Sequence, residues 1–263
     1  MESAAQSPAR IYETRLVPAI FRPLGEAVVT LARPKAGEHV LDAACGTGVV
    51  ARLVAPAVGS AGRTVGIDYD PVMLAMAESL EPGIEWRQGD IQNLPFPDHS
   101  FDLVICQQGL QFLPDRQAGA REFHRVLRDG GRVVLAIWTE VAKAPGHAAL
   151  FAALGTRLGT DMSTPPPWSL ADESEVRKLV TTAGFADVEV TLRSLRGRFP
   201  SARTFVEIML DGSSKATRQA LAQLPAGQRD EFIADVAARL QQYEAGGELE
   251  IPMETRLIVG WKR

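Results

Sequence analysis

Short apolar runs alternate with helix-like segments between residues 38 and 139, and this alternation narrows the possible folds more than any other feature. The runs typical of buried strands are 38–44, 64–70, 83–90, 101–108 and 132–138. The helical segments are 49–58, 71–80 and 116–131, the last of which we expect to end at Gly130–Gly131. Strands that alternate with helices form a parallel sheet covered by helices on both faces. The sequence therefore predicts an α/β fold with a doubly wound, Rossmann-like sheet.

The remaining segments complete this plan. Residues 186–199 and 249–263 are typical of two more strands, which gives a mostly parallel sheet of about seven strands with helical cap insertions; Pro252 favours a sheet edge or a bulge in the last one. We divide the chain into an N-terminal helical segment or lid (1–37), a core domain (38–140), an insertion (141–172) and a C-terminal part of the sheet (173–263) with a helical cap at about 201–246.

Composition excludes several classes of partner. The formal net charge is −4 and no basic run is present, so we expect neither nucleic acid nor an anionic membrane surface as a partner. We expect no signal peptide and no membrane span. The two cysteines and four histidines are too scattered for a disulfide framework or a metal site, which favours a cytoplasmic protein without a metal. No pattern indicates the oligomeric state.

A glycine turn follows the first predicted strand, in VLDAACGTGVV (40–50). Gly46, Gly48 and Ala51 fit the relaxed dinucleotide pattern G-x-G-x-x-A, and Asp68 follows about 20 residues later, so an NAD(P)-dependent reductase is one hypothesis. Asp42 argues against it, because a carboxylate near the turn would repel a pyrophosphate. S-adenosylmethionine (SAM) carries an ammonium that Asp42 would attract, although Asp42 could instead brace the loop.

Four segments together resemble the class I SAM-dependent methyltransferases, in the group related to quinone-biosynthesis methyltransferases. They are VLDAACGTG (40–48), GIDYDPVML (66–74), GDIQNLPFPDHSFDLV (89–104) and REFHRVLRDGGRVVLAIW (121–138). Their order and spacing are those of the family. Residues 141–263 match only in outline, and substrate specificity is expected there.

The resemblance implies roles for particular residues. Its cofactor is SAM and its product is S-adenosylhomocysteine (SAH). The residues expected to bind SAM are Asp42, Cys45, Gly46 and Gly48 around the methionine part, Asp68 at the ribose, Tyr69, Met73, Asp90 and Ile91 at the adenine, Gln107 at the methionine end, and Tyr12 facing the sulfonium. Alternatives stay open: Asp90 as a turn residue and Tyr12 as a helix-packing aromatic. We expect Gln108 to be structural.

The methyl acceptor is expected to be a small organic molecule that is modified at O, N or C. The sequence indicates no clear general base; Glu140 and His147 are the nearest candidates, and both types are common at surfaces. Candidate acceptor-pocket residues, which could equally belong to the core, are Phe112, Trp138, Trp168 and Met209. A reductase would usually carry a Tyr-x-x-x-Lys pair, and none is present. A non-catalytic SAM-binding protein remains a third hypothesis.

Overall fold

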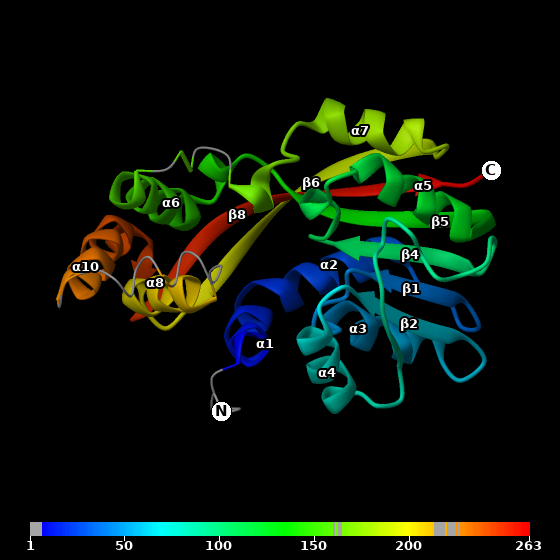
Figure 1. The fold of residues 1–263 in the computed structure, drawn as a ribbon, viewed down its shortest axis with the longest axis horizontal. Coiled ribbons are helices and arrows are strands. Elements are labelled where there is room, and N and C mark those ends of the chain that lie inside the picture. Colours follow the sequence, from blue (N-terminus) through cyan, green and yellow to red (C-terminus); the bar gives the residue numbers. More distant parts are fainter. Residues whose placement is uncertain (1–6, 160, 163–164, 213–218, 220–224, 226) are drawn as a thin grey trace. The chain divides into compact units, whose positions relative to one another are not determined.

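The computed structural model describes residues 7–159, 161–162, 165–212, 219, 225 and 227–263. The chain forms two compact units, which we describe separately (Figure 1). The sheet unit comprises Phe21–Thr139, Pro166–Arg193 and Thr255–Arg263. The helical unit comprises Met1–Ile20, Glu140–Pro165 and Ser194–Glu254.

An eight-stranded sheet has the strand order β3-β2-β1-β4-β5-β8-β6, with β7 paired to β8. The strands are β1 (His39–Ala43), β2 (Arg63–Asp68), β3 (Glu85–Gln88), β4 (Phe101–Gln107), β5 (Leu127–Trp138), β6 (Ala186–Phe199), β7 (Glu244–Ala245) and β8 (Glu248–Trp261). Strands β1 to β5 pair in parallel, and β8 runs antiparallel to β5. The predicted doubly wound, mostly parallel sheet is confirmed, and the two-residue β7 adds to the seven expected strands.

The order of the strands reverses beside β1. The chain proceeds from β1 to β2 and β3 on one side, and then returns to β4 on the other side. Asp42 of β1 is paired with Gly66 of β2 and with Ile105 of β4. The loops that follow β1, β2 and β4 therefore leave the same edge of the sheet next to one another, where ligands bind in folds of this class.

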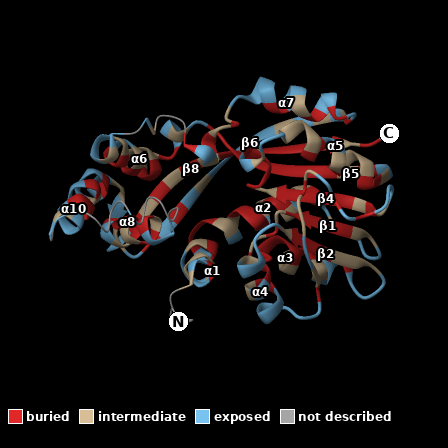
Figure 2. Cartoon of the chain, in the orientation of Figure 1, coloured by how far each residue is buried: buried red, intermediate tan, exposed pale blue. Residues whose placement is uncertain are grey.

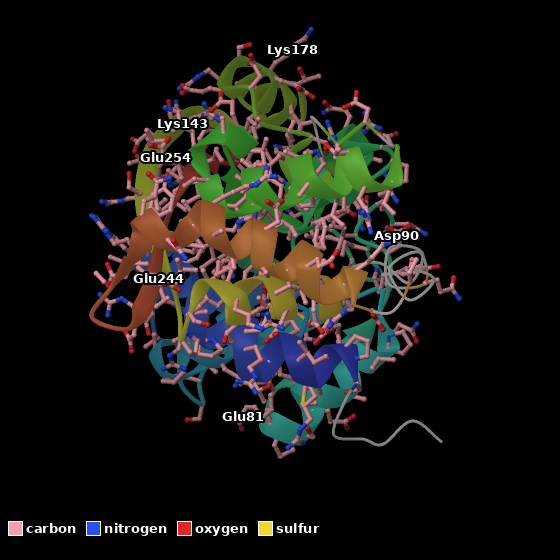
Figure 3. The ribbon with its side chains drawn as sticks, turned by 90° about the vertical axis from the view of Figure 1, so that its left-hand side faces the viewer. Glu81, Asp90, Lys143, Lys178, Glu244 and Glu254 are labelled. Carbon is pink, nitrogen blue, oxygen red and sulfur yellow. The ribbon has the colours of Figure 1, made fainter. Side chains whose placement is uncertain are left out.

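Four of the five α-helices of the sheet unit pack in pairs, and the fifth, α4 (Pro71–Leu80), packs on β2 and β3. The other four are α2 (Arg22–Ala32), α3 (Val49–Val58), α5 (Arg116–Val126) and α7 (Glu173–Thr182), and the unit also has the 3-10 turns η3 (Leu110–Phe112) and η5 (Pro166–Trp168). Helix α2 packs on α3, and α5 packs on α7. Figure 2 shows burial concentrated in β1, β4 and β5, whereas exposed charged residues such as Lys178 of α7 project outward in Figure 3.

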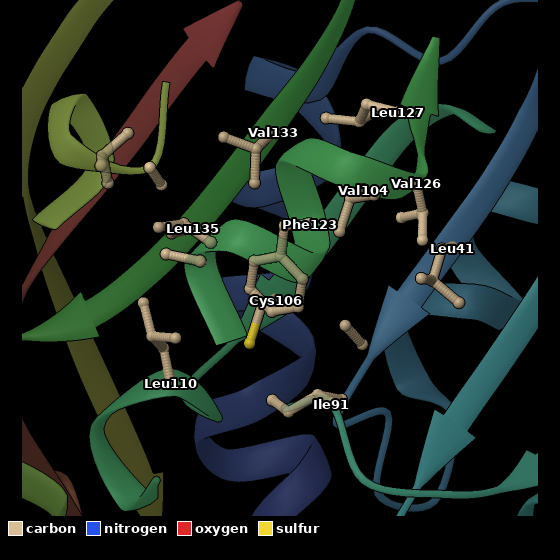
Figure 4. Packing of buried hydrophobic residues seen from close by; sticks show 14 of the residues in the cluster. Leu41, Ile91, Val104, Cys106, Leu110, Phe123, Val126, Leu127, Val133 and Leu135 are labelled. Carbon is tan, nitrogen blue, oxygen red and sulfur yellow. The ribbon is translucent and has the colours of Figure 1, made fainter. Parts of the chain in front are cut away.

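The main core lies between the sheet and the pair α5–α7. Alternate residues of β4, Val104 and Cys106, enter it together with Phe123 of α5 and Val176 of α7 (Figure 4 shows the first three). The intervening residue Ile105 is also buried but lies outside this cluster. Burial on both faces explains why β4 is almost wholly apolar rather than alternating.

The predicted helix 116–131 is wrong at its C-terminal end. Helix α5 ends at Val126, and Leu127 already has extended angles (φ −74°, ψ 143°). Gly130 donates its N–H to the carbonyl of Lys262, and the N–H of Lys262 returns to the carbonyl of Gly131. Pairing with the end of the chain, which local sequence does not reveal, takes these residues into β5 instead.

The helical unit contains the other described helices, together with β7 and parts of β6 and β8. Its helices are α1 (Pro8–Ile11), the π-helix η2 (Tyr12–Phe21), η4 (Val141–Lys143), α6 (Pro145–Leu158), α8 (Ala202–Asp211), α10 (Gln228–Leu240) and η6 (Gln241–Tyr243), with the last residue of η2 in the sheet unit. Pro18 lies inside η2, and the chain continues through it as a π-helix. Helix α10 packs on α6 and α8. Residues 213–218, 220–224 and 226 of the predicted cap lie outside the described residues.

The structure also bears on the expectations about membrane spans, cysteines, metal ligands and Pro252. Among the described residues, no helix has the length and apolar character needed to cross a membrane. Cys45 and Cys106 are free thiols, and both are buried. In the same part of the chain, no three His, Cys, Asp or Glu residues gather as metal ligands. Pro252 lies in β8 beyond Thr255, where the pairing of β8 with β5 ends, so it interrupts no hydrogen bond to β5.

Candidate functional site

A tight loop connects β1 to α3. Ala44, Gly46 and Gly48 have φ angles of +58°, +55° and +81°, and Gly48 is the N-cap of α3. The N–H of Cys45 donates to the carbonyl of Ile67 in β2, and the N–H of Gly48 donates to the carbonyl of Cys45. The loop therefore delivers the N-terminus of α3 to the edge of the sheet, which is a favourable place for a ligand carboxylate.

Asp42 braces the start of α3. Its carboxylate is buried and accepts a hydrogen bond from the N–H of Ala51, with an Oδ2–N distance of 2.9 Å. Ala51 lies in the first turn of α3, where a backbone N–H has no partner within the helix. Burial raises the pKa of Asp42 to about 7 from its usual 3.8, although the hydrogen bond from Ala51 opposes this shift. A bracing role is thus present, and attraction of an ammonium stays a prediction.

Asp68 connects the glycine loop to the end of β2. Its Oδ2 accepts the N–H of Gly46 at 2.7 Å, and its Oδ1 accepts the N–H of Asp70 at 2.9 Å. Burial raises the pKa of this carboxyl, against these two hydrogen bonds. The carboxylate is therefore held at the mouth of the loop by backbone donors, in the place where the ribose was expected.

Cys45 has no nucleophilic character in this arrangement. Its side chain is buried, and burial raises the pKa of its thiol well above the usual value. The nearby carboxyls of Asp42 and Asp68 add to this shift. A thiol that stays protonated is a poor nucleophile, so a contribution of Cys45 through its backbone and its small size stays a prediction.

Trp86 of β3 was missed in the sequence. Its indole ring lies against Gly48 and Gly66: a Cβ on Gly48 would be 2.2 Å from Cη2 of Trp86, and one on Gly66 would be 2.4 Å from Cε3. The indole Nε1 donates to the carbonyl of Glu81, which Figure 3 labels. The glycines therefore serve partly to admit this ring, and no local signal around Trp86 reveals the contact.

Substituting Gly66 with alanine is expected to destabilise the protein by about 1–3 kcal/mol, because the added methyl overlaps the ring of Trp86 in a packed core. Urea unfolding measures the change. In a Trp86→Leu background the same substitution should cost clearly less, because the obstacle is smaller. An equal cost in both backgrounds would show that the overlap is not the cause.

The residues expected at the adenine lie around the ends of β2 and β3. Tyr69 is 77% exposed, Met73 of α4 is half-buried, and Ile91 is buried. Asp90, labelled in Figure 3, accepts hydrogen bonds from the backbone and the side-chain amide of Gln92. Asp90 thus has the turn-forming contacts of the alternative interpretation, and the adenine contacts stay predictions.

Gln107 ends β4 beside the glycine loop. Its Nε2 donates to the carbonyl of Phe21 at 3.2 Å. Its Oε1 is buried and has no hydrogen-bond donor among the described residues. The following turn is close to β1, because a Cβ on Gly109 would lie 2.5 Å from Cβ of Ala44. A buried carbonyl oxygen without a donor is costly unless a ligand supplies one.

The predicted acceptor-pocket residues belong to four different elements. Trp138 at the end of β5 and Trp168 in η5 are buried and stacked, with ring centroids 6.4 Å apart. Phe112 is 54% exposed, on the 3-10 turn that follows β4. Met209 lies on α8 in the helical unit. Within the sheet unit, the two tryptophans therefore stack on each other, and the turn that carries Phe112 contacts the turn that carries Trp168.

Three further candidates also belong to the helical unit. Tyr12 opens the π-helix η2 and is half-buried, and Glu140 is the exposed N-cap of η4. His147 of α6 is buried beside Phe205, with ring centroids 5.3 Å apart in an edge-to-face arrangement. Burial lowers the pKa of His147 to about 4, so its imidazole is neutral at pH 7.

Comparison with known sequences points to one family. Residues 41–135 match the family model described as a methyltransferase domain. A demethylmenaquinone methyltransferase of Lactobacillus johnsonii is 38% identical over 105 residues, which are 38% of this chain and 43% of the relative. The chain therefore spans less than half the length of that relative. A "Probable S-adenosylmethionine-dependent methyltransferase" of Mycolicibacterium smegmatis is 31% identical over 208 residues, covering 79% of this chain and 74% of the relative.

Comparison of structures extends over nearly the whole chain. A phosphoethanolamine N-methyltransferase 2 of Haemonchus contortus, solved in complex with SAM, superposes with a TM-score of 0.62. It is 18% identical and covers 99% of this chain and 58% of its own. At that identity the similarity establishes the fold.

Proposed function

This chain belongs to the SAM-dependent methyltransferases, and on that basis we propose that it transfers a methyl group from SAM to a small organic acceptor. The feature that supports the proposal most strongly is the amide oxygen of Gln107 at the end of β4, which is buried and has no donor among the described residues. The ammonium at the methionine end of SAM is a donor of the kind this oxygen needs. NAD(P) offers no ammonium.

We propose that the loop residues Cys45, Gly46 and Gly48 surround the methionine part of SAM, with its carboxylate at the N-terminus of α3. Asp68 would accept hydrogen bonds from the ribose hydroxyls through lone pairs that its backbone donors leave open. Asp42 would act at longer range, because its carboxylate is buried behind the loop. Each of these groups is held by β1, β2 or the first turn of α3, so the site is preorganised.

The adenine would lie beyond Asp68. We propose that the exposed ring of Tyr69 and the side chains of Met73 and Ile91 cover its faces, and that Asp90 accepts a hydrogen bond from its amino group. An exposed tyrosine adjacent to a binding loop has apolar area available for a ligand. Tyr12 is proposed as an aromatic partner of the sulfonium, which attracts the face of a ring.

When bound, SAM supplies a methyl group already activated on a sulfonium ion. The residues of this chain then have to orient the acceptor and exclude water, and orientation contributes roughly 7–11 kcal/mol in favourable cases. A base is needed only for an acceptor that must lose a proton. Glu140 and His147 are proposed for that role; the neutral imidazole of His147 could accept a proton, but its burial opposes the resulting charge.

The acceptor itself is proposed only as a class. The name of the Lactobacillus johnsonii relative points to a quinone precursor, but its match covers 38% of this chain. Residues 141–263, where substrate specificity is expected, match the quinone methyltransferases only in outline. We therefore favour a different small acceptor, bound in part by Trp138 and Trp168.

Thermal melting with SAM, SAH, NAD and NADP in parallel tests the cofactor. A ligand that binds only the folded state, at 100 times its dissociation constant, adds about 2.7 kcal/mol of stability. For a chain of this size we expect a rise in Tm of roughly 5 °C or more with SAM and SAH and no rise with the nicotinamides. A rise with NAD or NADP alone would favour the reductase. SAH formation from SAM with an acceptor would then separate an enzyme from a SAM-binding protein.

A further inference from the structure

A chain of buried hydrogen bonds extends from the end of β4 across β5 to β8. Gln108 follows β4 with φ at +58°, and its Oε1 accepts the backbone N–H of Trp138 at 3.2 Å. Its Nε2 donates to Oγ1 of Thr255, which donates in turn to the carbonyl of Ile137. Gln111 of η3 donates its Nε2 to Oε1 of Gln108 at 2.7 Å. All three side chains are buried.

Two backbone groups determine the orientation of every side chain in this network. The N–H of Trp138 is a donor only, so the atom of Gln108 facing it is its oxygen. The hydroxyl of Thr255 donates its hydrogen to the carbonyl of Ile137. The hydroxyl oxygen can therefore only accept from Gln108, so the atom of Gln108 that faces it is the nitrogen Nε2. The oxygen of Gln108 then faces the nitrogen of Gln111. The network therefore leaves Oε1 of Gln111 as its terminal atom.

That terminal oxygen is buried and receives no donor from the described residues. Gln111 is 2% exposed, so bulk water does not reach its side chain freely. An amide flip would not help, because it would place two oxygens 2.7 Å apart at Gln108. A buried acceptor in this condition is destabilising, and such atoms usually have a functional reason.

Aromatic surface lies beside the same turn. The backbone carbonyl of Gln111 accepts from Oγ of Ser169 at 3.0 Å, and Ser169 directly follows Trp168, whose ring stacks on Trp138. Trp138 is also the residue whose N–H orients Gln108. Gln111 and Trp168 belong to single 3-10 turns, η3 and η5, which contact each other. Short 3-10 turns of this kind are easier to displace than the strands behind them, so a ligand could open a path to Oε1.

We propose that Oε1 of Gln111 is the recognition point for a hydrogen-bond donor on the methyl acceptor, and that the acceptor is an apolar or aromatic molecule bearing a neutral O–H or N–H group. This inference rests on the proposed methyltransferase function and adds the class of acceptor. An amide oxygen repels an anionic oxygen and does not take up protons at neutral pH. Gln111 is therefore a positioning residue that selects the protonated form of the acceptor.

Matched probes test this proposal on the full chain saturated with SAH. The pairs are 2-naphthol with 2-methoxynaphthalene and indole with N-methylindole, which differ in one donor hydrogen, and ligand-observed NMR gives their dissociation constants. In the wild type we expect a donor-bearing probe to bind at least roughly tenfold more tightly than its methylated counterpart. In Gln111→Leu this ratio should fall to about one through loss of affinity for the donor-bearing probe.

The matched control is Gln117→Leu, which removes an amide of the same size that donates to the carbonyl of Leu179 outside the network. It should keep the wild-type ratio. SAH affinity, measured separately by calorimetry, should be unchanged in both variants; failure of SAH to bind the wild type would refute the proposed function itself. Three outcomes with SAH bound would overturn the role of Gln111. They are equal affinities within each pair, absence of binding by both donor-bearing probes, and an unchanged ratio in Gln111→Leu.

Discussion

Replacing Asp68 with alanine is expected to reduce the affinity for SAM at least roughly 100-fold while the chain stays folded. A hydrogen bond to a charged group contributes about 1.5–3 kcal/mol, and the two ribose hydroxyls would lose two such bonds. The substitution also removes the hydrogen bond from the N–H of Gly46 to Oδ2 of Asp68, which measures 2.7 Å. The glycine loop between β1 and α3 therefore loses one of its supports. Isothermal calorimetry with SAM and SAH measures the loss.

Asp70, a second carboxylate two residues after Asp68, provides the control. Asp70 is the N-cap of α4 and accepts the N–H of Val72, but it has no proposed contact with SAM. Asp70→Ala should cost about 1 kcal/mol of stability, as for other N-caps, and leave SAM affinity unchanged. If Asp68→Ala binds SAM as well as the wild type does, the ribose assignment is wrong.

The stability of the protein without ligand is expected to fall as the pH rises from about 4 to 7 because of Asp42. Its pKa is about 7 in the folded chain against 3.8 when exposed, so the folded state retains a proton that the unfolded state loses. Each unit of pKa difference is worth about 1.4 kcal/mol, which gives about 4 kcal/mol in all. The stabilisation that the protonated Asp42 provides is complete below pH 3.8 and is lost above a pH of about 7, the pKa of Asp42 in the folded chain.

Asp42→Asn isolates this effect, because asparagine keeps an acceptor for the N–H of Ala51 and removes the titrating group. Relative to the wild type, it should gain about 3 kcal/mol of stability between roughly pH 5 and pH 8, measured by urea unfolding at each pH. Asp42→Ala also removes the acceptor for the N–H of Ala51, so its gain in stability should be about 0.5–2 kcal/mol smaller than that of Asp42→Asn. Parallel pH profiles for the wild type and Asp42→Asn would contradict a raised pKa.

The same pair of variants tests whether SAM is attracted to Asp42. A cation bound nearby would lower the pKa of Asp42, so SAM binding near pH 7 should release protons, and calorimetry in buffers of different ionisation enthalpy detects them. In Asp42→Asn the release should disappear and SAM should bind more weakly, without NAD binding in its place. Proton release that persists in Asp42→Asn would assign it to another group.

The predictions from sequence were most accurate where the signal is local. Strand β6 and helix α3 have the predicted bounds of 186–199 and 49–58, because alternation and helical periodicity are read within one segment. The end of α5 was misplaced by five residues, because Lys262 at the far end of the chain pairs with Gly130 and Gly131. The π-helix through Pro18 was likewise not predicted.

In the candidate site, too, features with a local sequence signal were predicted and contacts between distant segments were not. The glycine loop, Asp42 and Asp68 were read from spacing, since each lies at the end of a recognisable strand. The contact of Trp86 with Gly48 and Gly66 was missed, because it depends on which strands are neighbours. The cluster of Trp138 with Trp168 was expected only as a set of aromatics, and its stacking needed the folded chain.

By itself, the sequence determined the family and the doubly wound sheet and predicted the position of the cofactor loop, because these depend on short motifs and on periodicities of two and 3.6 residues. Only the tertiary structure decided that Asp42 is buried with a raised pKa and that Gln107 and Gln111 each retain a buried oxygen with no donor in the part of the chain that the structure describes. Solvation and hydrogen bonding at one atom depend on groups far away in the chain, as Gln108 and Thr255 show across 147 positions. No local pattern encodes such a neighbour, so the chemistry of the acceptor side emerges only when the chain is folded.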